Sequence, residues 1–242
     1  MIHIVWGQVV NFQRSIIIKT SWVISQNWSN VLFLHFSCEK ERIKKFLPDG
    51  LEIDTYNGEG YLSIVPFIMK DVRFPSLPPL PFASLWELNL RTYVKYKGRK
   101  GVYFFTLDTD HPLAQWIAKT FFNLPYRLRR MEGEIFSFNE KTKKFSFKSP
   151  DSFSVDALIG EKERYCERDA WLTERYSLFT PGSKGLYRGD VIHEPWKLRK
   201  VVRQAFCDDF TKQFGFSSPL KFIKASYSDG VNVFFKPFFL VS

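Results

Sequence analysis

The segment of residues 87–96 alternates between polar and apolar side chains, which predicts a β-strand with one face of polar side chains that could bind a ligand. Glu87, Asn89, Arg91 and Tyr93 lie on that face, and all four are specific hydrogen-bonding types. Along an extended strand, Glu87 and Arg91 lie roughly 13 Å apart. Their charges therefore need not neutralise each other, and the two side chains could hold the two ends of a small ligand. The alternative is a solvated outer face of a sheet.

Arg91 is the first candidate for ligand binding in this strand. A guanidinium group can clamp a carboxylate through two parallel hydrogen bonds. Because a charge buried among apolar neighbours is costly unless it is paired, Arg91 needs a partner. That partner is either a ligand or a protein carboxylate, with Glu87, Asp108 and Glu174 as the protein candidates.

The elements around this segment predict that it is a central strand. The apolar residues 61–72 form a strand before it, and a proline-rich loop or lid at 74–81 connects the two. Residues 102–107 return as its hairpin partner, after a turn that begins at Gly98. A helix follows, capped by Asp110.

The rest of the chain repeats this pattern of short strands with few helices. Further strands are predicted at 31–36, 134–138, 144–148 and 191–192, with a closing hairpin of 222–227 and 231–235, and further helices at 39–47, capped by Ser37, and at 200–214. This pattern predicts one α+β domain built on a large, curved, mostly antiparallel β-sheet, with a few helices at its rim. Closing the sheet into a cone or barrel would remove its exposed edges and create a central cavity.

Length and composition agree with a single domain. The chain has 242 residues, 45% of them hydrophobic, which suffices for one substantial core. We expect this domain at residues 28–242, with residues 1–27 as a leader or an extra edge strand. No apolar run approaches the ~18–20 residues of a membrane span, and we identify no signal peptide. Three widely spaced cysteines, Cys38, Cys166 and Cys207, argue against a disulfide framework and predict a cytoplasmic protein.

The sequence contains no motif for a metal or a cofactor. The four histidines form no HxxxH or HxH pair, and no CxxC pair is present. The glycine patterns GxGxxG and GxxxxGK[ST], which bind nucleotides, are absent as well. We therefore expect neither a metal nor a cofactor.

Several separate motifs resemble the YqjF-like family, a family of unknown function. They are VPF at 65–67, WELNLRTYV at 86–94, GVYFFTLD at 101–108, LPY at 124–126, LTERY at 172–176 and HEPWKL at 193–198. The motifs follow the family's order, and the resemblance extends from about residue 28 to about residue 236. It implies a fold related to acetoacetate decarboxylase, which is a cone-shaped β-sheet around a buried cavity.

The resemblance also implies a difference from that enzyme. Acetoacetate decarboxylase has a Gly-Phe-Pro-Lys-Lys motif whose first lysine forms a Schiff base with the substrate ketone, and this lysine is activated by its surroundings. Tyr126 takes the place of that lysine, and Arg127 the place of its cationic neighbour. Because a phenol forms no imine, decarboxylation through a Schiff base is not expected. Glu87 matches the position of an active-site glutamate of the decarboxylase.

The resemblance adds further candidates for the site. Tyr126 could pack inside the cone as a structural residue, or donate to a substrate oxygen beside Arg127, which would lower the pKa of its phenol. Glu174 and His193 lie in matching motifs, and the alternative for both is a salt-bridged loop that packs over the cone. The predicted ligand-binding set is Glu87, Asn89, Arg91, Tyr93, Tyr126, Arg127, Glu174 and His193, with Glu87 and Tyr126 as candidate catalytic residues.

We therefore expect a protein that binds a small carboxylate or carbonyl compound inside the cone. One alternative is an enzyme that uses Glu87 and Tyr126 for acid–base chemistry. The other is a nucleic-acid-binding surface, because 35 Lys and Arg against 25 Asp and Glu give a net charge of +10. A solvated basic surface is favoured over this second alternative, because the aromatic residues alternate at strand period and so belong in the core. One contiguous basic face would favour nucleic acid.

Overall fold

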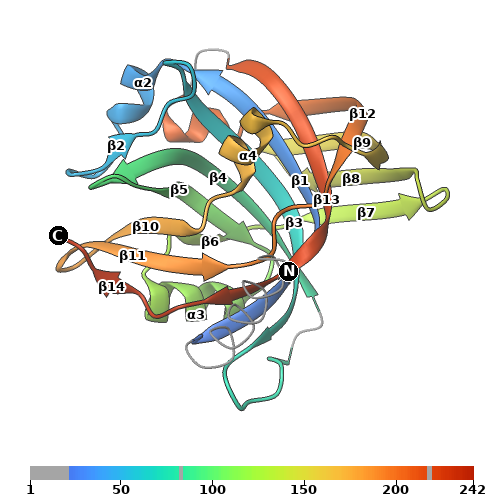
Figure 1. Cartoon of the computed structure of the whole chain (residues 1–242). Helices are drawn as coiled ribbons and strands as arrows, with labels where there is room; N and C mark the ends of the chain where they lie inside the picture. The colour runs from blue at the N-terminus through green and yellow to red at the C-terminus, as the bar shows by residue number, and fades with distance from the viewer. Residues whose placement is uncertain (1–21, 82–83, 217–219) are drawn as a thin grey trace, which may run out of the picture.

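The structure is a computed structural model that describes residues 22–81, 84–216 and 220–242 (Figure 1). Within these ranges the chain forms one α+β domain, a large curved sheet with short helices at its rim, as the sequence predicts. Most neighbouring strands are antiparallel. No helix of the described ranges is long and apolar enough to cross a membrane.

The centre of the fold is a closed barrel. Its strands are β1 (Ile24–Cys38), β3 (Gly60–Arg73), β4 (Ser84–Tyr96), β5 (Arg99–Thr109), β10 (Ser177–Gly182), β11 (Gly185–Ile192) and β13 (Lys221–Phe235). The strand order is β11-β10-β5-β4-β3-β1-β13, and β13 pairs back onto β11, with Phe235 opposite Val191. Closure leaves an interior into which every second side chain of each strand points.

A second sheet layer extends from β13 and packs against the outside of the barrel. It consists of β12 (Leu198–Asp208), β9 (Phe153–Lys162), β8 (Lys143–Ser149) and β7 (Glu132–Ser137). Leu88 and Leu90, on the outward face of β4, lie in one buried cluster with Phe145 and Phe147 of β8. Both faces of β4 are therefore buried, one in the barrel interior and the other under this layer.

Short elements cover the barrel and its edges. They are α2 (Lys40–Lys44), β2 (Glu52–Ile53), α3 (Pro112–Phe122), β6 (Tyr126–Leu128), α4 (Glu167–Thr173), the 3-10 helix η1 (Thr211–Phe214) and β14 (Phe239–Leu240). α3 covers the interior near the start of β4, where Ile117 faces the cavity. α4 covers the other end of β4, where the ring of Trp171 lies 4.7 Å from that of Tyr93.

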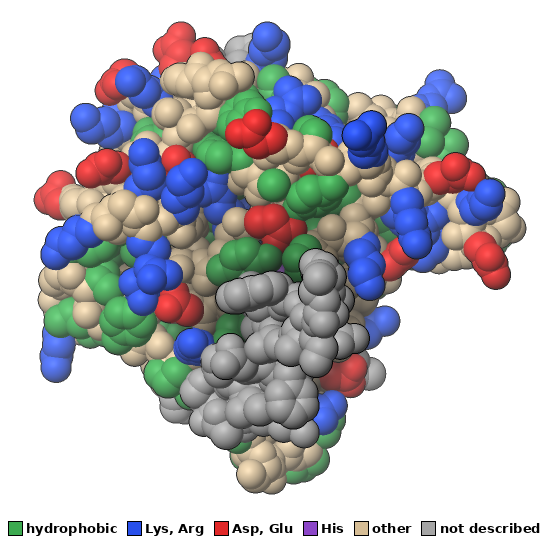
Figure 2. Space-filling view, in the orientation of Figure 1, with side chains coloured by type: hydrophobic (Ala, Val, Ile, Leu, Met, Phe, Trp, Pro, Cys, Tyr) green, Lys and Arg blue, Asp and Glu red, His purple; other side chains and the backbone are tan. Residues whose placement is uncertain are grey.

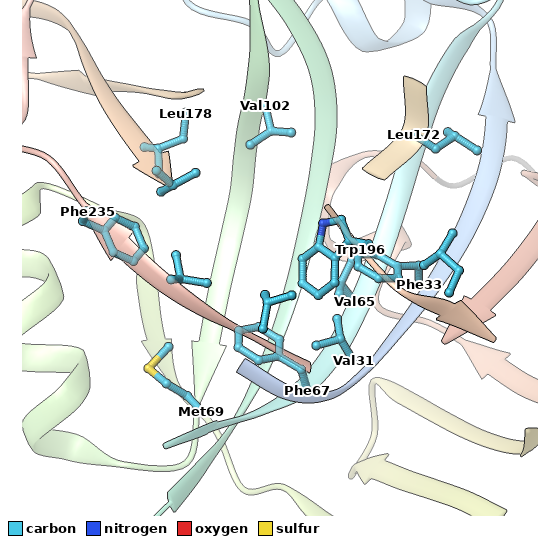
Figure 3. Close-up of a cluster of buried hydrophobic side chains, with 14 of the residues drawn as sticks. Val31, Phe33, Val65, Phe67, Met69, Val102, Leu172, Leu178, Trp196 and Phe235 are labelled. Carbon is cyan, nitrogen blue, oxygen red and sulfur yellow. The ribbon is translucent and has the colours of Figure 1, made fainter. Parts of the chain in front are cut away.

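Large apolar side chains from the strands fill much of the interior (Figure 3). Phe33 of β1 packs edge-to-face against Trp196, with ring centroids 5.0 Å apart. Leu178 of β10 and Phe235 of β13 lie on the opposite side of the interior in Figure 3, with Met69 of β3 below them. These residues bring distant parts of the chain into one core.

A two-residue turn connects β4 to β5. Lys97 and Gly98 have φ values of 46° and 78°, the left-handed geometry that suits a tight hairpin. β5 therefore begins at Arg99, earlier than the predicted 102, and Gly101 lies within the strand. A Cβ atom on Gly101 would lie 2.6 Å from the carbonyl oxygen of Ser177, so this position needs glycine where β5 and β10 pair.

Two predicted elements at the C-terminal end are wrong. Residues 200–214 form β12 and η1 instead of a helix, because pairing with β9 and β13 outweighs the local helix propensity of the segment. Residues 222–235 form the single strand β13 instead of a hairpin. Gly230 within it has a φ of 140° and lies so close to β1 that a Cβ atom would be 2.2 Å from the carbonyl oxygen of Trp28.

The helix starts also differ from the predictions. Ser37 lies in β1 and does not cap α2, whose N-cap is Glu39. α3 has His111 at its N-cap, whereas the Asp110 carboxylate accepts a hydrogen bond from the backbone N–H of Trp86.

The predicted leader or edge strand at 1–27 falls largely outside the described residues. β1 begins at Ile24, so the expected start of the domain at residue 28 lies inside this strand.

Candidate functional site

The barrel encloses a cavity of about 90 Å³ that is lined mainly by apolar side chains. Val65 and Phe67 of β3 form one wall, and Ile117 and Phe122 of α3 close one end. A few polar residues interrupt this apolar surface: Glu87, Asn89 and Arg91 of β4, Gln26 of β1 and Tyr126 of β6. Apolar walls with a small number of placed polar groups are typical of small-molecule sites.

Three of the predicted residues reach the cavity from β4. Glu87, Asn89 and Arg91 all line it, and they are 2%, 4% and 8% exposed, respectively. Their spacing of two residues puts them on the same face of the strand. Tyr93 shares this face but lies further along the strand, beyond the cavity lining.

Tyr126 reaches the same cavity from β6. β6 pairs in parallel with β5, which places Tyr126 beside Leu107, and Leu107 in turn lies opposite Asn89. The Tyr126 hydroxyl donates a hydrogen bond to Oε2 of Glu87. Two candidates that lie 39 positions apart in the sequence are thus in direct contact.

Burial changes the acid–base behaviour of this pair. It raises the pKa of Glu87 from 4.5 to about 7, although hydrogen bonds from Tyr126 and Asn89 act in the opposite direction. The pKa of Tyr126 lies well above its ordinary value, because of burial and the neighbouring Glu87. The predicted lowering of the Tyr126 pKa by Arg127 is therefore wrong.

Arg127 points away from Tyr126 because successive residues of a strand face opposite sides. Its Nε and Nη2 atoms each donate to the Asp108 carboxylate at 2.9 Å. Arg129 forms a second ion pair with Asp108 at 2.6 Å, and the Arg127 guanidinium also lies 4.6 Å from the ring centre of Phe214. Arg127 therefore anchors β6 and does not line the cavity.

Arg91 is a buried cation for which the described residues provide no ion pair. Desolvation lowers the pKa of its guanidinium, and the Tyr93 side chain beside it acts in the opposite direction. The guanidinium carbon lies 5.5 Å from the ring centre of Phe33. Within the described chain, Nε and Nη2 of Arg91 and Oδ1 of Asn89 are buried without a hydrogen-bond partner.

Each carboxylate considered as a partner of Arg91 is engaged elsewhere. Glu87 accepts from Tyr126, and Asp108 pairs with arginines of the β6 segment. Glu174 accepts from the Tyr165 hydroxyl at 2.5 Å and from the backbone N–H of Trp196 at 3.0 Å.

Glu174 and His193 lie outside the cavity lining, around Trp196. His193 Nδ1 lies 2.7 Å from the carbonyl oxygen of Glu194, and its ring lies 5.1 Å from that of Trp196. Trp196 itself lines the cavity. The two residues thus contact a residue of the cavity wall without lining the cavity themselves.

Sequence reasoning missed a buried hydrogen-bond network next to Arg91. Ser63 Oγ lies 2.6 Å from the Tyr93 hydroxyl and 2.7 Å from Nδ1 of His35. Burial and the charge of Arg91 lower the pKa of His35 to about 3, so this histidine is neutral. The signal was present in the alternation of β1, which puts His35 on the same inward face as Phe33.

Metal binding finds no support in the part of the chain that the structure describes. No group of three or more His, Cys, Asp or Glu side chains there could hold a metal ion.

The closed barrel and its buried cavity define a protein of the acetoacetate decarboxylase-like fold. Acetoacetate decarboxylase from Legionella pneumophila matches with a TM-score of 0.61 and 13% identity, over 88% of this chain and 84% of that one. An acetoacetate decarboxylase-like enzyme from Sphingomonas wittichii RW1 matches with a TM-score of 0.63 and 11% identity, over 88% and 91%. The enduracididine biosynthesis enzyme MppR, complexed with pyruvate, matches with a TM-score of 0.63 and 12% identity, over 92% and 90%.

Within this fold, the chain belongs to the DUF2071 family. The model of this family, described as an uncharacterised conserved protein, matches residues 25–232. The uncharacterised protein YqjF of Bacillus subtilis (strain 168) is 36% identical over 224 residues, which cover 89% of this chain and 91% of that relative. The resemblance derived from the sequence motifs is confirmed.

Proposed function

We propose that this protein binds a small carboxylate inside the barrel cavity, with Arg91 as the group that clamps it. The observation that carries the proposal is the unpaired edge of the Arg91 guanidinium. Nε and Nη2 are buried, and no described residue accepts a hydrogen bond from either. These two N–H groups lie side by side on a guanidinium and match the two oxygens of a carboxylate. A bound carboxylate would also neutralise a charge whose burial is otherwise costly.

A second candidate function is acid–base catalysis on the bound molecule by Glu87 and Tyr126. The pKa of Glu87, about 7, supports it, because a group that titrates near neutral pH can both accept and donate a proton. When protonated, the Glu87 carboxyl group could also donate a hydrogen bond to a carbonyl oxygen of the ligand.

The surface charges favour the cavity over a nucleic-acid surface as the functional site. Basic and acidic side chains are interspersed on the face shown in Figure 2. Several basic side chains are ion-paired, among them Lys95 with Asp54, Arg127 with Asp108, and Arg199 with Asp229. A nucleic-acid surface would instead present a continuous set of cations to phosphates.

We also propose a reducing compartment for this protein, as expected from the sequence. Cys38, Cys166 and Cys207 are free thiols in the structure, the last two of them exposed. Exposed free thiols are typical of cytosolic proteins, in which disulfides are rare.

Calorimetric titration with butyrate and with its uncharged amide, butyramide, tests the proposed function. We expect the wild-type protein to bind butyrate and not butyramide, and Arg91→Met to lose the binding of butyrate. Arg130→Met is the control, because it removes an exposed arginine that lies outside the cavity and pairs with the exposed Glu132, and it should bind butyrate like the wild type. Equal binding of butyrate by the wild type and Arg91→Met would contradict the clamp.

A further inference from the structure

We propose that the ligand of this cavity is a short monocarboxylate with a hydroxyl group, and that this hydroxyl donates a hydrogen bond to Oδ1 of Asn89. The inference rests on the proposed function, because it assumes that Arg91 holds the carboxylate group. It adds a second recognition element, which selects among carboxylates.

The order of polar groups along β4 gives the first argument. Glu87, Asn89 and Arg91 occupy successive inward positions, each roughly 7 Å from the next. Arg91 offers two free donors to the cavity, and Asn89 offers one free acceptor. A single molecule that accepts from Arg91 and donates to Asn89 would satisfy all three buried atoms that the described chain leaves unpaired on this strand.

The Asn89 amide has a defined orientation. Its Nδ2 donates to Oε1 of Glu87 at 3.4 Å, while Oε2 of Glu87 accepts from Tyr126. When Glu87 is ionised, the reverse orientation would place the amide oxygen against a carboxylate oxygen, and two acceptors repel each other. Oδ1 is therefore the atom that Asn89 presents to a ligand.

The free acceptor on Asn89 distinguishes between classes of ligand. A carbonyl group in this position would place two acceptor oxygens together and leave Oδ1 unpaired. An ammonium group could donate as well, but it would add a buried cation between Arg91 and Glu87, and Glu87 is only partly ionised near neutral pH because burial raises its pKa to about 7. A hydroxyl group donates without adding charge, so it fits the site best.

The remaining surface of the cavity limits the rest of the ligand. The volume of about 90 Å³ and the apolar walls suit a short hydrocarbon chain. Arg91 is the one cation among the described lining residues, so a second ionised carboxylate would be buried without a partner. These properties together specify a short hydroxy monocarboxylate.

The test compares four probes of the same chain length by calorimetry on the wild-type protein: butyrate, 2-hydroxybutyrate, 3-hydroxybutyrate and acetoacetate. We expect at least one hydroxybutyrate to bind about tenfold more tightly than butyrate, which corresponds to one additional hydrogen bond. Acetoacetate, which carries a carbonyl in place of the hydroxyl, should bind more weakly than that hydroxybutyrate. Because this series uses the wild-type protein, it does not depend on the folding of any variant.

The variant Asn89→Leu tests whether the preference for hydroxybutyrate over butyrate depends on the Asn89 amide, since leucine has a similar size and no amide. We expect it to lose the preference for hydroxybutyrate over butyrate. If the wild type binds butyrate and both hydroxybutyrates within twofold of one another, hydroxyl recognition is refuted while the Arg91 clamp stands. Tighter binding of acetoacetate than of either hydroxybutyrate would refute it as well. Failure of all four probes to bind would refute the proposed function itself.

Discussion

Replacing Arg91 with methionine should leave the ligand-free protein as stable as the wild type or more stable. Arg91 is 8% exposed, and no carboxylate of the described residues forms an ion pair with it. Methionine keeps the approximate length of the side chain and removes its charge. No buried carboxylate loses its counterion through this change, in contrast to the removal of one member of a buried ion pair.

The magnitude follows from the contacts of the guanidinium. The variant loses the contact with the Phe33 ring at 5.5 Å, which contributes about 0.5–2 kcal/mol. It also loses the favourable electrostatic interaction with the neighbouring Tyr93 side chain. Against these losses it removes the desolvation penalty of a buried ion, which amounts to several kcal/mol. We expect a free energy of unfolding between that of the wild type and about 3 kcal/mol above it.

Arg175→Met is the matched control for this measurement. Arg175 is buried to the same degree, 6% exposed, but its Nη1 lies 2.6 Å from Oδ2 of the buried Asp54. Removing it leaves Asp54 buried with only the more distant Lys95 at 3.8 Å, so the variant should lose about 3–5 kcal/mol. Urea denaturation of both variants gives the comparison. An Arg91→Met protein as destabilised as Arg175→Met would refute the reasoning, because Arg91 would then neutralise a protein carboxylate.

Three further predictions concern the Glu87–Tyr126 pair and the absent Schiff base. The pKa of Glu87 is about 7 in the folded protein and 4.5 in the unfolded chain, so the folded state binds more protons between these values. The contribution of Glu87 to the free energy of unfolding should therefore fall by about 3 kcal/mol from pH 4.5 to 7. Urea denaturation at a series of pH values should show that Glu87→Gln lacks this fall. The same pH dependence of the free energy of unfolding in Glu87→Gln and the wild type would contradict the assignment. Tyr126→Phe removes a hydrogen bond that lowers the pKa of Glu87, so in this variant the infrared band of the Glu87 carboxyl group should titrate with a midpoint above about 7. A midpoint below that of the wild type would be inconsistent with this contact. No lysine lines the described part of the cavity, so borohydride with acetoacetate should leave no adduct on a cavity peptide, as checked by mass spectrometry; an adduct there would identify a catalytic lysine.

The polar face of β4 could be predicted from the sequence because it depends on a local property. Alternation with a period of two places Glu87, Asn89 and Arg91 on one side of any strand, whatever its surroundings. The burial of both faces could not be predicted in the same way. It depends on the layer of β7, β8, β9 and β12, which packs against β4 only after the chain has turned back from β13.

The partners of the charged residues lay beyond the sequence for a related reason. Asp108 and Glu174 were as plausible as counterions of Arg91 as any ligand, since ion pairs form between residues far apart in the chain. The structure pairs Asp108 with Arg127 and leaves Arg91 facing the cavity. The position of Tyr126 in the cavity came from the resemblance to a known family, because the parallel pairing of β5 and β6 has no local signal.

The helix predicted at 200–214 was wrong for a different reason, because the helix propensity of its residues indicated a structure that the fold does not adopt. Residues such as Lys200, Arg203 and Gln204 favour helices, yet the segment pairs with two strands in a sheet. From Arg203 to Asp208, exposed and partly buried residues alternate, as in a strand with one face in water.

The most direct test of the central claim is a crystal structure of the protein grown with 3-hydroxybutyrate. The account predicts electron density for one molecule inside the barrel, with its two carboxylate oxygens about 2.7–2.9 Å from Nε and Nη2 of Arg91. Density for the molecule only outside the barrel, with Arg91 paired to a protein carboxylate, would contradict the claim.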